Sequence, residues 1–297
     1  MANHAEQDSA MRMLDGTAYR VSGSGEPLVL IHGVGMNASI WAPQIAEFER
    51  DHTVIAFDVL GHGDSAMPPE NATLDDYVAQ AARLLRSLDI ERATIVGHSM
   101  GALIAIGLAS SHPELVGRLI ALNAVFDRTP EQRDAVMNRA TSLGPEGALT
   151  DMHVTLGRWL GTANPEPGPA ADAILRCLAS VDAQGYARAY RVFASSDRAH
   201  VDVLPHLDMP AFYLTGELDA NSSPAMSERM AGLTPRGISE SLDGERHMMA
   251  VVSPRKVNHA IRAFLDQSPR QASTCAATTM STDGSGQKMA VTGQGES

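Results

Sequence analysis

The sequence predicts an α/β fold, with a mostly parallel sheet of the eight-stranded type, helices on both faces and an inserted helical cap. The first observation is a set of short, uninterrupted apolar runs, at 28–31, 54–57, 93–96, 119–122 and 211–214. Strands that are buried on both faces show such runs, which are typical of a parallel sheet. The second observation is that helical patterns lie between the runs, as βαβ crossovers require.

The clearest predicted helix begins after Thr73. The Thr73 hydroxyl is a suitable N-cap, and Asp76 stands three residues later, at the acidic position of a capping-box pattern. Apolar side chains then recur at helical spacing, at Val78, Ala81, Leu84, Leu85 and Leu88. Near the C-terminus, the pattern predicts a last strand at 238–242 and a final helix that begins near Pro254.

The chain is expected to hold one domain that is interrupted by an insertion. The strand signal disappears between Phe126 and about Pro205, where Ala, Arg, Met and Leu predominate. We therefore predict the first part of the core at 1–125, a helical cap at 126–205 and the second part of the core at 206–267. Residues 268–297 are rich in Ser, Thr, Gly, Gln and Ala without apolar periodicity, which predicts a disordered tail.

Composition narrows the classes of function. The formal net charge of −12 disfavours nucleic acid and anionic membrane surfaces as partners, so we expect a small-molecule substrate. No apolar run reaches about 18 residues and the N-terminal residues lack a signal-peptide pattern, which predicts a cytoplasmic protein. Neither a metal nor an organic cofactor is expected, because no ligand-spaced cluster or glycine-rich phosphate loop is present. Cys177 and Cys275 are expected to stay reduced, and the oligomeric state is not predicted.

The strongest motif is Gly-His-Ser-Met-Gly at 97–101, which follows a predicted strand and precedes a helical run at 102–106. Such a tight strand-to-helix turn forces its central residue, here Ser99, into strained backbone geometry, and the flanking glycines leave room for close packing. We therefore predict that Ser99 is a nucleophile. A hydroxyl is a poor nucleophile at neutral pH, so the chain must also supply a base and a carboxylate that orients the base.

Five segments together resemble a known family. They are Leu-Ile-His-Gly at 30–33, Asp-Val-Leu-Gly-His-Gly-Asp-Ser at 58–65, the pentapeptide at 97–101, Thr-Gly-Glu-Leu-Asp at 215–219 and Arg-His-Met-Met at 246–249. These segments resemble the successive landmarks of the α/β-hydrolase superfamily. Their spacing is similar to that of the 3-oxoadipate enol-lactonase and small carboxylic-ester and amide hydrolase group. The resemblance extends from about Thr17 to Leu265.

The resemblance implies a catalytic triad of Ser99, Asp219 and His247, which occur in the chain order of this fold. Asp219 follows the predicted strand at 211–214, and His247 lies between the last predicted strand and the final helix. Some members of the family place the acid after the preceding strand, which leaves Asp127 open as an alternative.

The resemblance also implies an oxyanion hole made of two backbone N–H groups, those of Val34 and Met100. Because backbone groups donate, the prediction depends on Gly33 and Gly35 keeping the first loop open. At Arg246 the family more often has glycine, so this arginine is expected either to crowd or to charge the entrance of the site.

The predicted cap supplies candidates for substrate binding. They are Trp159 and five arginines, Arg158, Arg176, Arg188, Arg191 and Arg198. We predict that one or two of the arginines, with Arg191 as the named candidate, bind a substrate carboxylate bidentately while Trp159 forms an apolar wall.

The predicted function is hydrolysis of a carboxylic ester, lactone or amide-type bond in a small metabolite through an acyl-enzyme. Two enzymatic alternatives use a similar triad, namely a carbon–carbon bond hydrolase of a dienoic acid and a cofactor-free haloperoxidase-like activity. A non-catalytic ligand-binding protein on the same fold is a further alternative. Serine at position 99, in place of aspartate, argues against a dehalogenase.

Overall fold

The computed structural model of the protein describes residues 10–143, 152–161 and 168–267. Within these residues it contains an eight-stranded sheet with the order β1-β2-β4-β3-β5-β6-β7-β8. The strands are β1 (Arg12–Leu14), β2 (Thr17–Ser22), β3 (Glu26–Ile31), β4 (His52–Phe57), β5 (Ala93–His98), β6 (Val116–Leu122), β7 (Ala211–Gly216) and β8 (Gly237–Leu242). β2 pairs antiparallel with both β1 and β4, and the other neighbours pair in parallel, which confirms the predicted fold class.

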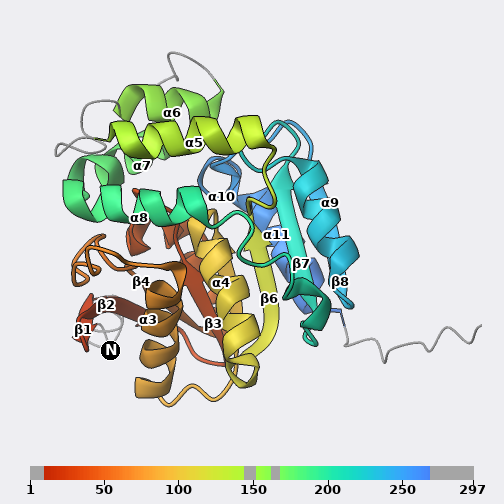
Figure 1. The fold of residues 1–297 in the computed structure, drawn as a ribbon. Coiled ribbons are helices and arrows are strands. Elements are labelled where there is room, and N and C mark those ends of the chain that lie inside the picture. The colour runs from red at the N-terminus through yellow and green to blue at the C-terminus, as the bar shows by residue number, and fades with distance from the viewer. Residues whose placement is uncertain (1–9, 144–151, 162–167, 268–297) are drawn as a thin grey trace, which may run out of the picture. The chain divides into compact units, whose positions relative to one another are not determined.

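Helices cover both faces of the sheet. They include α2 (Ala42–Phe48), α3 (Leu74–Ser87), α4 (Met100–Ser111), α9 (Pro224–Leu233), α10 (Met249–Val252) and α11 (Pro254–Leu265), with short 3-10 turns at Ala38–Trp41, Pro113–Leu115 and Leu204–His206. In Figure 1, α3, α4 and α9 lie in front of the sheet and α11 lies behind it. Within the described ranges, no helix has both the length and the apolar character needed to cross a membrane.

The predicted strands are present, and the burial of their residues explains why the sequence signal was strong. All six residues of β5 and all six of β7 are buried, as expected for central strands with both faces covered. The sequence pattern did not predict β1 and β2, because β2 alternates apolar with polar residues and β1 is a short, exposed edge strand. The predicted helix start at Thr73 is also confirmed, since the Asp76 carboxylate accepts a hydrogen bond from the Thr73 backbone N–H at 2.8 Å.

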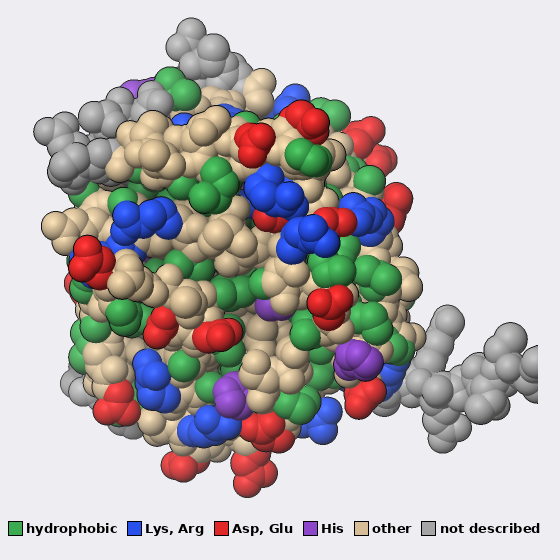
Figure 2. Space-filling view, viewed as in Figure 1, with side chains coloured by type: hydrophobic (Ala, Val, Ile, Leu, Met, Phe, Trp, Pro, Cys, Tyr) green, Lys and Arg blue, Asp and Glu red, His purple; other side chains and the backbone are tan. Residues whose placement is uncertain are grey.

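In the described part of the segment between β6 and β7, four α-helices are present. They are α5 (Pro130–Ser142), α6 (Met152–Leu160), α7 (Pro169–Ser180) and α8 (Ala183–Ser195). Figure 1 shows them gathered beyond one end of the sheet strands. On the face seen in Figure 2, acidic and basic side chains are interspersed over these helices and over the helices that lie in front of the sheet. Cys177, in α7, is a free and buried thiol. The predicted tail at 268–297, which includes Cys275, lies outside the described residues.

Candidate active site

Ser99 occupies the turn between β5 and α4 with φ +55° and ψ −115°. This backbone conformation is unfavourable for a residue with a Cβ atom and persists only where the surrounding packing imposes it. The two motif glycines show how the packing does so. A Cβ atom on Gly97 would lie 2.1 Å from the Gly101 carbonyl oxygen, and one on Gly101 would lie 2.2 Å from the carbonyl oxygen of Ile31. Both positions therefore require glycine, and the turn has the geometry that the motif predicts.

His247 and Asp219 are hydrogen-bonded to each other below the surface. Asp219 lies in the loop after β7 and His247 lies in the loop after β8, and the His247 Nδ1 and Asp219 Oδ2 atoms are 2.8 Å apart. The backbone N–H groups of Asn221 and Ser222 donate to the other carboxylate oxygen, Oδ1, at 2.8 and 3.1 Å. Burial raises the pKa of Asp219, but the charge and hydrogen bond of His247 and the hydrogen bonds from Asn123 and Asn221 together outweigh burial and leave that pKa below its ordinary value.

Asn123 is a member of this cluster that sequence reasoning missed. It directly follows β6 with φ +49°, and its Nδ2 donates to Asp219 Oδ2 at 2.8 Å, the same oxygen that His247 contacts. Its side-chain oxygen is buried and has no hydrogen-bond partner among the described residues. A signal was available, because Asn123 ends the apolar run at 119–122 just as Asp219 follows the run at 211–214.

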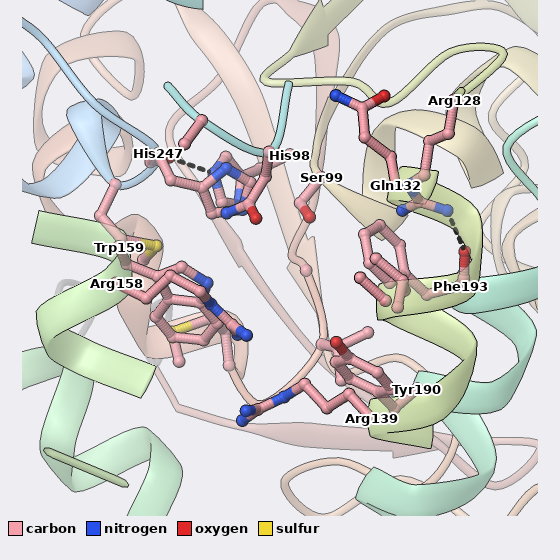
Figure 3. Close-up of a pocket in the computed structure, with 18 of the residues that line it drawn as sticks. His98, Ser99, Arg128, Gln132, Arg139, Arg158, Trp159, Tyr190, Phe193 and His247 are labelled. Carbon is pink, nitrogen blue, oxygen red and sulfur yellow. Dashed lines mark hydrogen bonds between the residues drawn. The ribbon is translucent and has the colours of Figure 1, made fainter. Parts of the chain in front are cut away.

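A cavity of about 260 Å³ opens beside these residues. Ser99, His98, His247, Val34 and Trp159 all line it. Figure 3 shows His247, His98 and Ser99 in the upper middle of the view, with Trp159 and Arg158 on the left, Arg139 and Tyr190 below and Phe193 on the right. Across the described part of the chain, the Ser99 hydroxyl has no hydrogen-bond partner, and its contact with a base in such sites often tightens only when substrate binds.

The backbone N–H groups of Val34 and Met100 lie in the two segments where an oxyanion hole is expected. Met100 is the first residue of α4, so its N–H has no partner within that helix. Val34 follows β3, and its N–H donates to no other described residue. Two unpaired peptide donors next to a serine are suited to bind a developing negative charge.

Three arginines line the same cavity, and no described Asp or Glu side chain does. Arg128 is almost fully buried and is paired with Asp197, with 3.6 Å between Arg128 Nη1 and Asp197 Oδ1. Arg139, by contrast, donates from Nη2 to the hydroxyl of Thr155 at 2.8 Å and has a buried Nε without a partner among the described residues. Arg158 is exposed as a whole residue, but burial around its guanidinium and then the charge on Arg139 lower its pKa. Neither Arg139 nor Arg158 forms an ion pair with a described carboxylate.

The other sequence-predicted candidates are found in different places. Trp159, in α6, lies 6.0 Å from the His247 ring between ring centroids. Arg191, in α8, is exposed and lines a separate shallow depression with Glu70 and Asn71, so the structure does not bring it to the cavity. Helix α8 presents its apolar face to the site and turns this arginine away, a feature that residue type alone does not reveal.

Two further expectations concern charged residues near the predicted triad. Asp127 is paired with Arg198 and Arg229, and no contact with His247 accompanies these pairs in the described structure. Arg246 donates to the carbonyl oxygen of Leu218 at 3.2 Å and is not among the residues that line the cavity. Its guanidinium instead packs against the backbone at Gly161, where an added Cβ atom would lie 2.2 Å from Arg246 Cζ.

Comparison with known proteins identifies the family to which the chain belongs. The family model described as alpha/beta hydrolase fold matches residues 26–143. The chain is 40% identical over 251 residues to (E)-2-((N-methylformamido)methylene)succinate hydrolase of Acinetobacter baylyi, which covers 84% of this chain and 94% of that relative. It is 28% identical over 239 residues to 3-oxoadipate enol-lactonase 2 of the same organism, which covers 80% of this chain and 88% of that relative.

A solved structure supports the same assignment. The thermophilic esterase from Thermogutta terrifontis, solved with malate bound, matches with a TM-score of 0.76 at 26% identity and covers 84% of this chain and 92% of that chain. The sequence match to the Acinetobacter baylyi relative spans nearly the whole of that protein, and the serine turn has the geometry of the fold's nucleophile elbow. The protein therefore belongs to the α/β-hydrolase family of enzymes.

Proposed function

We propose that the protein hydrolyses a carboxylic ester, lactone or amide-type bond of a small anionic metabolite through an acyl-enzyme. The observation that carries this proposal is the composition of one cavity, which joins Ser99 and His247 to two arginines without carboxylate partners among the described residues. A nucleophile with its base accounts for the chemistry, and the unpaired positive charges account for the choice of substrate.

Acylation begins at Ser99. His247 takes the proton of the Ser99 hydroxyl as the oxygen attacks the substrate carbonyl carbon, and the carbonyl becomes a tetrahedral oxyanion. The N–H groups of Val34 and Met100 donate hydrogen bonds to this oxyanion. These hydrogen bonds are stronger in the transition state than in the bound substrate. His247 then gives its proton to the departing amine or alcohol, and an acyl-serine ester remains.

Deacylation repeats these roles with water as the nucleophile. His247 removes a proton from the water as it attacks the acyl-serine carbonyl, and it returns a proton to the Ser99 oxygen as that bond breaks. Asp219 stays ionised and holds the Nδ1–H of His247, which keeps Nε2 free to accept and deliver protons. The lowered pKa of Asp219 supports this role, because a neutral acid would not stabilise the imidazolium.

Arg139 and Arg158 are the residues that we propose to bind a substrate carboxylate, in place of Arg191. A guanidinium binds a carboxylate through paired N–H donors, and partial removal from water strengthens the contact. The unpaired, buried Nε of Arg139 is one such donor. Trp159 covers the His247 side of the same cavity and supplies the apolar wall.

The chemistry in the name of the Acinetobacter baylyi relative agrees with this proposal. That name describes a succinate, which has two carboxylates, with an N-methylformamido group, which is an amide. We therefore propose that a dicarboxylate with an amide-type bond is the first substrate to examine for this protein.

The test compares an N-acylaminomethylene succinate with its dimethyl ester, which lacks both negative charges. Arg139→Met and Arg158→Met each replace one cationic side chain with an uncharged side chain of similar length. Arg83→Met makes the same change on the exposed face of α3 and is the matched control. Each cavity variant is expected to raise KM for the dicarboxylate by about tenfold to a hundredfold, since charged hydrogen bonds contribute about 1.5–3 kcal/mol. In both cavity variants, KM for the neutral ester is expected to stay near the parent value. In Arg83→Met, KM is expected to stay near the parent value for both substrates.

Two results would contradict parts of the proposal. If both cavity variants treat the two substrates as the parent does, the cavity does not select a carboxylate. If the parent cleaves neither compound but cleaves a dienoic acid at a carbon–carbon bond, the reaction class is wrong although the family assignment stands.

A further inference from the structure

We infer that His62 is a positioning residue that fixes the place of the Val34 N–H donor in the oxyanion hole. This inference rests on the proposed function. His62 lies on the loop at 58–65, which follows β4 and which we call the support loop. The oxyanion loop, residues 32–38, follows β3 and contains Val34. Because β3 and β4 are parallel neighbours in the sheet, both loops leave the same edge and lie side by side.

The contact between the loops is a hydrogen bond to the peptide that follows Val34. The Gly35 N–H donates to His62 Nε2 at 2.9 Å. That N–H belongs to the peptide plane that joins Val34 to Gly35, so the bond fixes the orientation of the chain one residue from the Val34 donor. Gly35 has φ +80°, which favours glycine, and it therefore has no side chain with which to hold the loop by other means.

The ring of His62 is held in the tautomer that this bond requires. Its Nδ1 lies 3.1 Å from the carbonyl oxygen of Leu60, and a proton on Nδ1 that donates there leaves the Nε2 lone pair free to accept. The ring is buried, and burial, together with the neighbouring His32, lowers the pKa of His62 to about 3. The imidazole therefore stays neutral near physiological pH, and Nε2 remains an acceptor.

The support loop is a firm base for His62. A Cβ atom on Gly61 would lie 2.7 Å from the Cα atom of Gly185 at the start of α8, so the two backbones are in direct contact. Leu60 is fixed by a hydrogen bond from its N–H to Gln80 Oε1 at 2.9 Å. Movement of the Val34 donor is consequently limited by a chain of contacts that runs from α3 and α8 through His62 to the oxyanion loop.

Two other bonds join the loops, but neither acts on the peptide next to Val34. The Ala38 N–H donates to Asp58 Oδ1 at 2.7 Å, and the Val59 N–H donates to His32 Nε2 at 3.0 Å. These contacts keep the loops together when the His62 bond is removed. Loss of His62 is therefore expected to misplace one donor without detaching the loop.

The test uses two amide side chains of different reach. In His62→Gln the side-chain oxygen can take the place of Nε2, whereas in His62→Asn it is too short to do so. The control is His200→Asn, which removes another buried imidazole, one that donates to the carbonyl oxygen of Leu103 in α4 at 2.8 Å. All variants are assayed with p-nitrophenyl acetate, and phenylboronic acid serves as a mimic of the tetrahedral intermediate.

His62→Asn is expected to lower kcat by about tenfold to a hundredfold with little change in KM, because displaced donors lose transition-state stabilisation. Phenylboronic acid should bind more weakly by a similar factor, and His62→Gln should recover most of both losses. His200→Asn should lower the melting temperature while leaving kcat and the boronate affinity near those of the parent.

The inference is overturned if His62→Asn only lowers the melting temperature and keeps kcat and boronate affinity, as the control does. It is also overturned if His62→Gln is as impaired as His62→Asn. A parent protein that neither cleaves the ester nor reacts with a serine-directed phosphonate would instead refute the proposed function itself.

Discussion

The pH dependence of stability tests the buried histidines of the fold. His32, His62, His98 and His200 are all buried, and burial is the largest cause that lowers their pKa values, to about 4, 3, 3 and 4. In the unfolded chain each imidazole titrates near 6.5. Below that pH the unfolded state binds protons that the folded state does not bind, so the free energy of unfolding falls as the pH falls.

The magnitude follows from these shifts. At about pH 5, each unfolded imidazole is almost fully protonated while each folded one stays neutral, which removes about 2 kcal/mol per histidine relative to about pH 8. Four such groups remove about 8 kcal/mol, which is comparable with the whole stability of an ordinary domain. The steepest fall is expected between about pH 6 and pH 5, at about 5 kcal/mol per pH unit.

Urea unfolding followed by circular dichroism from about pH 8 to pH 5 measures this slope. His200→Gln should make the slope shallower by about one proton, or about 1.4 kcal/mol per pH unit, whereas His259→Gln, at an exposed position of α11, should leave it unchanged. If the free energy of unfolding falls by less than about 2 kcal/mol over the whole range, the four rings are not held neutral by burial and the reasoning is wrong.

The predictions that follow concern the triad. Asp219→Asn should lower kcat by about 10⁴-fold, because the histidine loses the acceptor that fixes its tautomer, while Asp127→Asn should leave turnover near that of the parent. The reverse pattern in the same rate assay would show that Asp127 is the acid. Ser99→Ala combined with His247→Ala should cost little more than either single change, because the members of a triad act as a unit. If the reductions in turnover of the two single variants add up in the double variant, Ser99 and His247 do not act in the same catalytic step.

Sequence reasoning succeeded where local patterns determine the structure. The buried strands were visible because central parallel strands admit few polar residues, and Ser99 was visible because only glycine tolerates the contacts at positions 97 and 101. His247 and Asp219 were predicted from the resemblance to the α/β-hydrolase superfamily, and their positions after predicted strands agreed with it. The structure places His247 Nδ1 2.8 Å from Asp219 Oδ2, and the roles of the two residues as base and orienting acid stay a prediction.

Contacts that depend on helix orientation and on loop packing could not be predicted from the sequence. Arg139, Arg158 and Arg191 all lie on inserted helices, and the chain pattern does not say which helix faces line the cavity. Asn123 and His62 form hydrogen bonds to residues distant in sequence, so neither their sequence neighbours nor their residue type indicated these partners. The edge strand β1 was missed because its exposed residues give no burial signal.

The most direct test of the account is covalent trapping of the nucleophile. The protein is incubated with an ethyl p-nitrophenyl phosphonate, and peptide mapping by mass spectrometry locates the adduct formed as p-nitrophenol leaves. The account predicts stoichiometric modification of Ser99, no reaction in Ser99→Ala and a much slower reaction in His247→Ala, whose serine lacks its base. An unmodified parent, an adduct on a different residue, or full turnover by Ser99→Ala would contradict the claim that Ser99 is the nucleophile.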